Sequence, residues 1–314
     1  MNTPSNVPPV SPDPPAVASP RMAATRCLSW SIRRELWENR SLTIAPAAVA
    51  AFVLFVMLIT IAAALPRRMR TLATLDPAAQ HAMIVRPFCT SPGPIMMVTI
   101  LVGIFYALDA LYGERRDRSI LFWKSQPVSD LETVLSKAAI PLIVLPLIGF
   151  LLSVATQVVL LLWSTVILSA SGLSPEVVWT EFRFIQMPLV MLYGIAAFTL
   201  WHAPLYGWLL LVSGWARRMP VLWAALPFVA VGLVERVAFN TSYFGAWMRD
   251  RIMGALPAAF DIPPMKRGSM PLLDRLEQLH PVKFLGTSGL WIGLIVTMAF
   301  LAAAVRLRRF REPL

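Results

Sequence analysis

The stretch LTIAPAAVAAFVLFVMLITIAAAL, residues 42–65, decides the fold class of this chain. It carries no charged residue, and about 20 apolar residues at a helical rise of about 1.5 Å are enough to cross the hydrocarbon core of a bilayer. Blocks of the same kind recur at 94–111, 138–170, 187–213, 221–238 and 289–305. The sequence therefore predicts an all-α integral membrane protein in which 42–305 forms a six-span transmembrane domain.

The composition agrees with this class. Of the 314 residues, 57% are hydrophobic and 14% are charged, whereas soluble domains carry about 25% charged residues. The apolar residues stand in long blocks and do not recur at the spacing of one helical face, which argues against a soluble domain. The net charge of +11 indicates contact with a membrane surface. Because the basic residues flank the spans, no nucleic-acid partner is expected.

The block 138–170 is longer than one span. As a straight helix it would reach about 50 Å, against a hydrocarbon core of about 30 Å. Two readings are open. Either Pro141 and Pro146 kink the helix, because proline lacks a backbone donor and clashes with the preceding turn, or one end of the helix projects into water.

Two segments precede the first span. Residues 1–26 begin with a proline-rich stretch, which predicts a disordered cytoplasmic tail and lacks the features of a signal peptide. Residues 27–41, CLSWSIRRELWENRS, place Leu28, Ile32 and Leu36 at every fourth position. This pattern predicts an amphipathic helix lying in the headgroup plane. The alternative is that the segment is only the aqueous start of the first span.

The distribution of Lys and Arg predicts the orientation. With the N-terminus inside, the inner segments hold sixteen basic residues and the two short outer segments hold five. Both ends, including the basic tail at 306–314, are therefore expected in the cytoplasm. Three arginines in the first outer segment, Arg67, Arg68 and Arg70, oppose this orientation.

A polar loop at 113–137 separates the second and third spans. Its centre, DRSILFWKSQPVSD at 117–130, leads into an S-x-x-E capping box, which predicts a helix that starts near 130 and runs into the third span. The residues before Pro127 are compatible with a second short helix. Its apolar side chains would be Ile120, Leu121 and Trp123. From the residues alone, this segment either docks another protein or lies back on the bilayer.

Three stretches carry a family resemblance. The loop LYGERRDRSILFWKSQPVSDLETVLSK (111–137) closely resembles the first cytoplasmic loop of ABC-2-type transporter permeases. WSIRRELWENRSLTIAP (30–46) resembles the elbow helix and the start of the first span in one branch of that family, and LPFVAVGLVERVAFNTSYF (226–244) resembles its fifth span. The order of the matches and the six predicted spans extend the resemblance over the whole chain.

The resemblance implies a half-transporter in a bacterial cytoplasmic (inner) membrane. Two six-span subunits, either a homodimer or a pair with a second permease subunit, would each dock a cytosolic ABC ATPase, most often for export. The first loop would be the coupling helix, with Trp123 as its apolar anchor and its charges setting orientation. Its docking residues would be Asp117, Arg118, Ser119, Ile120, Leu121, Trp123, Lys124 and Pro127.

Motifs for chemistry on this chain were not found. The sequence has no G-x-x-x-x-G-K-[ST] phosphate loop, so the chain is not expected to be an enzyme, and ATP and Mg²⁺ are expected on the partner ATPase. No catalytic triad motif and no metal-ligand spacing occur, and no bound metal is expected. His202, within the fourth block, is expected to bond to a neighbouring carbonyl.

Two acidic residues near span ends are the remaining candidates, because a charge in hydrocarbon costs at least about 2–3 kcal/mol. They are Asp109, at the end of the second block, and Glu235, at the end of the fifth. Either residue would contact substrate or act as a gate, or each is a boundary residue that pairs locally or reaches water. The segment 239–288 that follows is expected to hold short helices, at AWMRDRIMGALPAAFDIPP and LLDRLEQLH, as an outer lid or a plain connector.

The expected function is thus the membrane-spanning subunit of an ATP-driven exporter. Two alternatives remain. One is an ion-coupled secondary transporter, although no charge lies deep in any block. The other is an ABC-associated membrane subunit with a signalling or assembly role, which would share the same docking loop.

Overall fold

The computed structural model describes residues 24–119, 128–262 and 272–310. Within these ranges the regular secondary structure is helical, apart from an isolated bridge between Phe260 and Leu279. Six helical stretches of the described chain are long and apolar enough to cross a membrane, which confirms the predicted multi-span class. They are Ser41–Arg70, Pro77–Arg116, Asp130–Ala170, Glu176–Trp215, Pro220–Phe239 and Ser288–Phe310.

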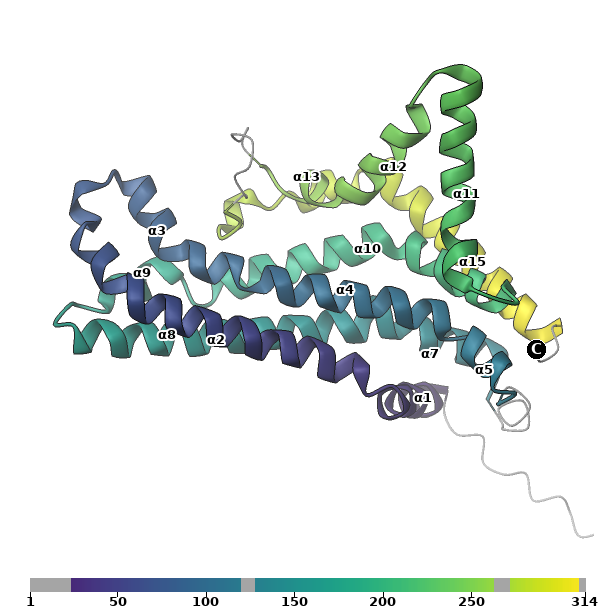
Figure 1. Ribbon diagram of the computed structural model, residues 1–314, viewed down its shortest axis with the longest axis horizontal. Coiled ribbons are helices and arrows are strands. Elements are labelled where there is room, and N and C mark those ends of the chain that lie inside the picture. Colours follow the sequence, from purple (N-terminus) through teal and green to yellow (C-terminus); the bar gives the residue numbers. More distant parts are fainter. Residues whose placement is uncertain (1–23, 120–127, 263–271, 311–314) are drawn as a thin grey trace, which may run out of the picture.

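The first four of these stretches run along one long axis (Figure 1). Helix α2 (Ser41–Arg70) packs against α4 (Pro92–Asp109) and α8 (Leu145–Ala170), and α10 (Gln186–Trp215) packs along α15 (Ser288–Phe310). At one end of the bundle lie α1 (Ala24–Glu38), α5 (Tyr112–Arg116), α7 (Asp130–Ala139) and the C-terminal end of α15. We call this the junction end. The opposite end carries α3 (Pro77–Thr90) and α9 (Glu176–Phe182).

The long third block continues directly from α7. The Ser129 hydroxyl accepts from the Glu132 amide at 3.1 Å and the Glu132 carboxylate accepts from the Ser129 amide at 2.9 Å, which is the predicted capping box. A π turn, η2 (Ile140–Val144), contains Pro141 and joins α7 to α8. This turn accommodates the proline without ending the helix. Helix α8 ends where Gly172 adopts φ +68°, a conformation that glycine takes without steric cost.

The fifth stretch stands apart. Helix α11 (Pro220–Val234) and the π turn η3 (Glu235–Phe239) project away from the four-helix axis (Figure 1). The most apolar 18-residue part of this stretch is not buried inside the protein. The chain then returns through α12 (Tyr243–Met253), α13 (Ala255–Ala259) and α14 (Pro281–Leu285). The prediction of a short helix at 272–280 is wrong, because the chain forms only a three-residue 3₁₀ turn, η4 (Leu276–Gln278). The Gln278 side chain bonds to the backbone of Leu272, Asp274 and Arg275 and so takes the place of helical hydrogen bonds.

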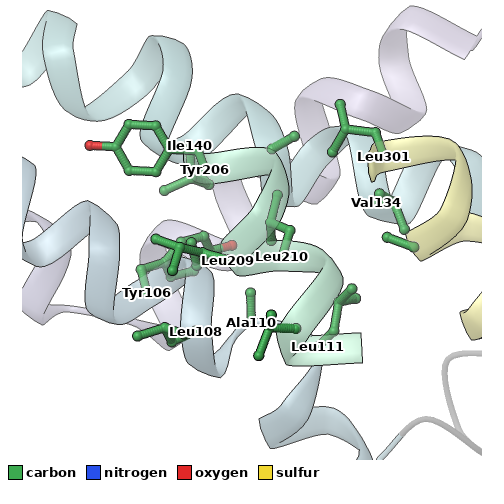
Figure 2. Packing of buried hydrophobic residues seen from close by; sticks show 14 of the residues in the cluster. Tyr106, Leu108, Ala110, Leu111, Val134, Ile140, Tyr206, Leu209, Leu210 and Leu301 are labelled. Atoms are coloured by element: carbon green, nitrogen blue, oxygen red, sulfur yellow. The ribbon is translucent and has the colours of Figure 1, made fainter. Parts of the chain in front are cut away.

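The main hydrophobic core lies beside the junction end (Figure 2). Tyr106 and Leu111 from the second stretch meet Val134 of α7, Leu210 of α10 and Leu301 of α15. Gly207 of α10 lies against Thr297 and Phe300 of α15. Within a bilayer such packing is the main force that holds helices together, because lipid tails are as apolar as the side chains. The core therefore fixes the relative positions of the elements that carry the candidate site.

Candidate functional site

The loop between the second and third spans leaves the bundle at the junction end. Of the eight predicted docking residues, the structure describes Asp117, Arg118 and Ser119; Ile120, Leu121, Trp123, Lys124 and Pro127 lie outside the described residues. Asp117 accepts from the Arg116 Nε at 3.0 Å, and Arg118 adopts the left-handed φ of +57°. Helix α5 therefore ends in a sharp turn at the point where the loop begins.

A buried network of charges joins the two ends of this loop. We call it the junction cluster, and its members are Glu35, Glu114, Asp130, Lys137 and Arg308. The Lys137 Nζ lies 2.9 Å from Glu35 Oε1 and 3.1 Å from Glu114 Oε1. Arg308 pairs with the other Glu114 oxygen through Nη1, and its Nε lies 3.1 Å from Asp130 Oδ1. Glu114 precedes the segment 117–127 that carries the predicted docking residues, and Asp130 follows it, so Arg308 of the last span bridges the two sides of this segment.

The cluster is charge-balanced and withdrawn from solvent. Lys137 is 3% exposed and Arg308 is 6% exposed. With Arg34, whose Nη2 lies 3.0 Å from Glu35 Oε1, three cations face three carboxylates. A buried ion without a partner costs several kcal/mol, and a second ion with good hydrogen-bond geometry removes much of that cost. The members therefore hold one another in place.

Glu35 is the residue through which α1 joins the cluster. The Tyr106 hydroxyl donates to its second oxygen at 2.8 Å. Burial by itself would raise the pKa of the Glu35 carboxyl, but the charge and hydrogen bond of Lys137, together with Tyr106 and Arg34, hold the pKa below its ordinary value. Glu35 is therefore a carboxylate at neutral pH, and α1 is tied to the third span by a charge-assisted bond.

Helix α5 is fixed to the end of α10 by a second set of bonds. The Ser213 hydroxyl accepts from the amides of Leu111 and Tyr112 at 3.0 and 2.9 Å. The Arg115 Nη1 donates to the Gly214 carbonyl at 2.6 Å. The segment that enters the loop is thus anchored to the fourth span as well as to the third and the last.

Helix α1 presents two different faces. Ile32 and Leu36 pack on the main core, whereas Trp30 and Trp37 are exposed, Trp37 by 83%. Two members of the predicted apolar repeat, Ile32 and Leu36, therefore pack on the bundle. The two tryptophans remain available for the headgroup region or for a partner.

A cavity of about 480 Å³ lies between α1, α4 and α5. Its charged lining is mostly acidic: Glu35, Glu38, Asp109, Glu114 and Asp117, with Lys137 as the only cation among the lining residues. Burial, the largest effect, raises the pKa of Glu38, and the nearby Glu35 and Glu114 add to the increase. Asp117 and Ser119 place the start of the loop on the wall of this cavity.

The two acidic gate candidates do not share a site. Asp109 lies at the junction end, where its side chain is exposed and 3.9 Å from Arg116. Glu235 instead holds the start of α12: it accepts from the Thr241 hydroxyl at 2.9 Å and from the amides of Tyr243 and Phe244 at 2.6 and 2.9 Å. A role in a substrate path remains a prediction for both residues.

Replacing Glu235 with alanine should loosen the first turn of α12. The change removes three accepted hydrogen bonds at a helix N-terminus, where loss of a capping group costs about 1 kcal/mol. Hydrogen exchange of residues 243–246 should rise about fivefold. Arg236→Ala, an exposed neighbour, is the control. Equal exchange in the wild type and in Glu235→Ala would show that the cap is not formed in the bilayer.

His202 and His81, which lie outside the junction end, each contact two oxygen atoms. His202 Nδ1 lies 2.9 Å from the Phe198 carbonyl, as expected, and its Nε2 lies 3.1 Å from the Ile252 carbonyl. At the opposite end of the bundle, His81 of α3 lies between two carboxylates. Its Nδ1 is 2.5 Å from Glu181 of α9, and its Nε2 is 2.6 Å from Asp274. No local pattern in the sequence indicates the contact of His81 with Asp274, because the two residues are 193 positions apart.

No protein-family model, curated protein or solved structure matches the chain. Among the residues at 24–119, 128–262 and 272–310, no group of three or more His, Cys, Asp or Glu side chains is arranged to hold a metal ion. The geometry of the junction end is therefore the main basis for a functional conclusion.

Proposed function

We propose that this chain is the permease subunit of an ATP-driven ABC transporter, with export as its direction and ATP and Mg²⁺ bound by a separate ATPase subunit. The observation that carries the proposal is the junction cluster. It links Glu114 and Asp130, on either side of the docking segment 117–127, to the first helix, the third span and the last span. A loop that only connected two spans would not need such a frame at its base.

The frame gives the loop a mechanical role. A push on the loop moves α5 and α7, and Lys137 and Arg308 pass that movement to α1 and α15. Separating buried ions costs several kcal/mol, so the joined elements move as one body. The motion of a closing ATPase pair would thus reach spans two, three and six together.

The docking contact itself is assigned to the loop. Trp123 is its apolar anchor, because aromatic residues commonly dominate interface energetics. Asp117, Arg118 and Lys124 set the orientation through complementary charge. In this arrangement α1 is an elbow helix with Trp30 and Trp37 in the headgroup region, and both termini face the cytoplasm of a bacterial inner membrane.

A second permease subunit completes the transporter. Helix α11 and the η3 turn are exposed along most of their length, with Val229 and Leu233 of α11 and Val237 of η3 among the exposed apolar side chains. A homodimer, or a heterodimer with a related permease, would cover part of this surface, and the substrate path would lie between the subunits.

Trp123→Asp should abolish recovery of the ATPase. The tagged full-length chain is purified from native membranes, and copurifying proteins are identified by mass spectrometry. Loss of an anchoring aromatic costs at least about 2 kcal/mol, which raises the dissociation constant of the complex about 30-fold. Trp247→Asp, at an exposed tryptophan of α12, is the matched control and should recover as much ATPase as the wild type. Absence of an ATPase with the wild type would overturn the proposal in favour of a secondary transporter.

A further inference from the structure

A second cavity, of about 580 Å³, lies between α2 and α3, at the end of the bundle opposite the junction. Its wall is mainly apolar, with Met57, Ile61 and Leu65 on α2 and Ala82 and Met83 on α3. Most of these side chains are half-buried, and Arg68 and Arg86 on its rim are exposed. The cavity is therefore open at its side and not sealed inside the protein.

The cavity spans the boundary between apolar and polar parts of the chain. On α2 its lining extends from Met57 to Arg68, which at a rise of about 1.5 Å per residue corresponds to roughly 16 Å. Met57, Ile61 and Leu65 belong to the uncharged stretch 42–65, and Arg68 lies just beyond its end. One end of the cavity thus lies at hydrocarbon depth and the other at the level where headgroups begin.

The polar end is cationic. Within the described chain no carboxylate lies within 4.0 Å of a nitrogen of the Arg68 or Arg86 side chain. The hydroxyls of Thr60 and Thr90 donate to carbonyls of their own helices, so the two guanidinium groups are the main donors available to a ligand. Guanidinium groups match phosphate oxygens in both charge and geometry.

We propose that this cavity binds one anionic phospholipid of the surrounding bilayer. The phosphate lies between Arg68 and Arg86, and an acyl chain lies along Met57, Ile61 and Met83. An apolar trough that ends in unpaired cations fits an anionic amphiphile and no simple inorganic anion. The inference needs only that the chain spans a membrane, and it is independent of the proposed transport function.

Native mass spectrometry of the full chain tests the site. The protein is exchanged into detergent containing phosphatidylglycerol or phosphatidylcholine with matched acyl chains, and retained lipid is measured. The wild type should retain phosphatidylglycerol preferentially. The double variant Arg68→Gln/Arg86→Gln should lower its affinity roughly 30-fold, since each basic residue near the headgroups contributes about fivefold. Arg67→Gln/Arg70→Gln removes the same charge from exposed arginines outside the cavity and should leave retention unchanged.

A cavity-filling variant separates a lipid site from a phosphate site. Ala82→Trp fills the apolar wall without changing charge and should reduce retention of phosphatidylglycerol, while excess inorganic phosphate should not displace the lipid from the wild type. Three outcomes would overturn the proposal: equal losses in both double-arginine variants, unchanged retention in Arg68→Gln/Arg86→Gln, or displacement by inorganic phosphate. If Ala82→Trp does not fold, the two exposed double-arginine variants still decide the question.

Discussion

Replacing Lys137 with methionine should lower the free energy of unfolding by about 3–5 kcal/mol, the typical cost of removing one partner from a buried ion pair. The methionine can occupy the space of the lysine stem, so the loss would reflect charge and not packing. Without the ammonium group, Glu114 keeps Arg308 and Glu35 keeps Arg34 and Tyr106. The cluster is nevertheless left with three carboxylates against two cations. The thermal midpoint in detergent should fall by roughly 10 °C.

The double variant Lys137→Met/Glu114→Gln tests the electrostatic origin of this loss. It restores the balance of charge, and the glutamine amide oxygen can still accept from Arg308. At least half of the lost stability should return, as expected for sites that are energetically coupled. Lys283→Met, at an exposed lysine with no ion pair in the described chain, should change the midpoint little. Losses that simply add in the double variant would contradict a coupled cluster.

His81→Phe should release the segment 272–279 from the bundle. Asp274, with a side chain 7% exposed, would lose its 2.6 Å hydrogen bond with His81, whereas Glu181 is 37% exposed and would be hydrated. The expected cost is about 3 kcal/mol, since an acceptor left without a partner in the interior costs about 1–3 kcal/mol, and more when it is charged. Hydrogen exchange of residues 272–279 should therefore rise roughly 100-fold. The contact of α3 with α9 should survive, because the rings of Phe88 and Phe182 pack at 4.7 Å.

His280 provides a matched control for this experiment. Its Nε2 lies 3.7 Å from Asp261, and both side chains are well exposed, the histidine by 45%. Exposed pairs of this kind contribute about 0–1 kcal/mol, so His280→Phe should change exchange at 272–279 little. Equal protection in His81→Phe and wild type would show that the three segments near His81 are held by other contacts.

These two variants act at opposite ends of the bundle. The Lys137 variant acts on the frame at the base of the loop, and the His81 variant acts on the connections at the opposite end. If the proposed function is correct, the first should also reduce the response of the transporter to its ATPase. The second should leave docking intact, because none of its contacts reaches the junction end.

The local elements could be predicted from the sequence because their causes are local. An uncharged block such as 42–65 is long enough for a span whatever its neighbours are, and the capping box at 129–132 sets a helix start by bonds within four residues. The position of His202 beside the Phe198 carbonyl follows from helix spacing in the same way. The 3₁₀ turn within 272–280 could not be predicted in this way, because it depends on the side-chain bonds of Gln278 to the backbone of Leu272, Asp274 and Arg275.

The junction cluster could be predicted only in part. Glu35, Glu114, Lys137 and Arg308 each stand beside or within a helix that continues into an apolar block, and a charge in such a place requires a partner. The sequence does not say which partner it finds, since Glu35 lies 102 positions from Lys137 and Arg308 lies 194 positions from Glu114.

The sequence by itself determined the membrane class, the number of spans, the capped start of the third span and the polar loop between the second and third spans. These depend on hydrophobic length and on bonds within a few residues. Only the tertiary structure decided that Lys137 and Arg308 join both ends of the loop. The same holds for His81, which links α3 to α9 and to the segment 272–279. It also holds for Arg68 and Arg86, which flank an apolar cavity. Such pairings depend on how helices distant in the chain pack, because the partner of a charge and the wall of a cavity come from side chains that no local pattern identifies.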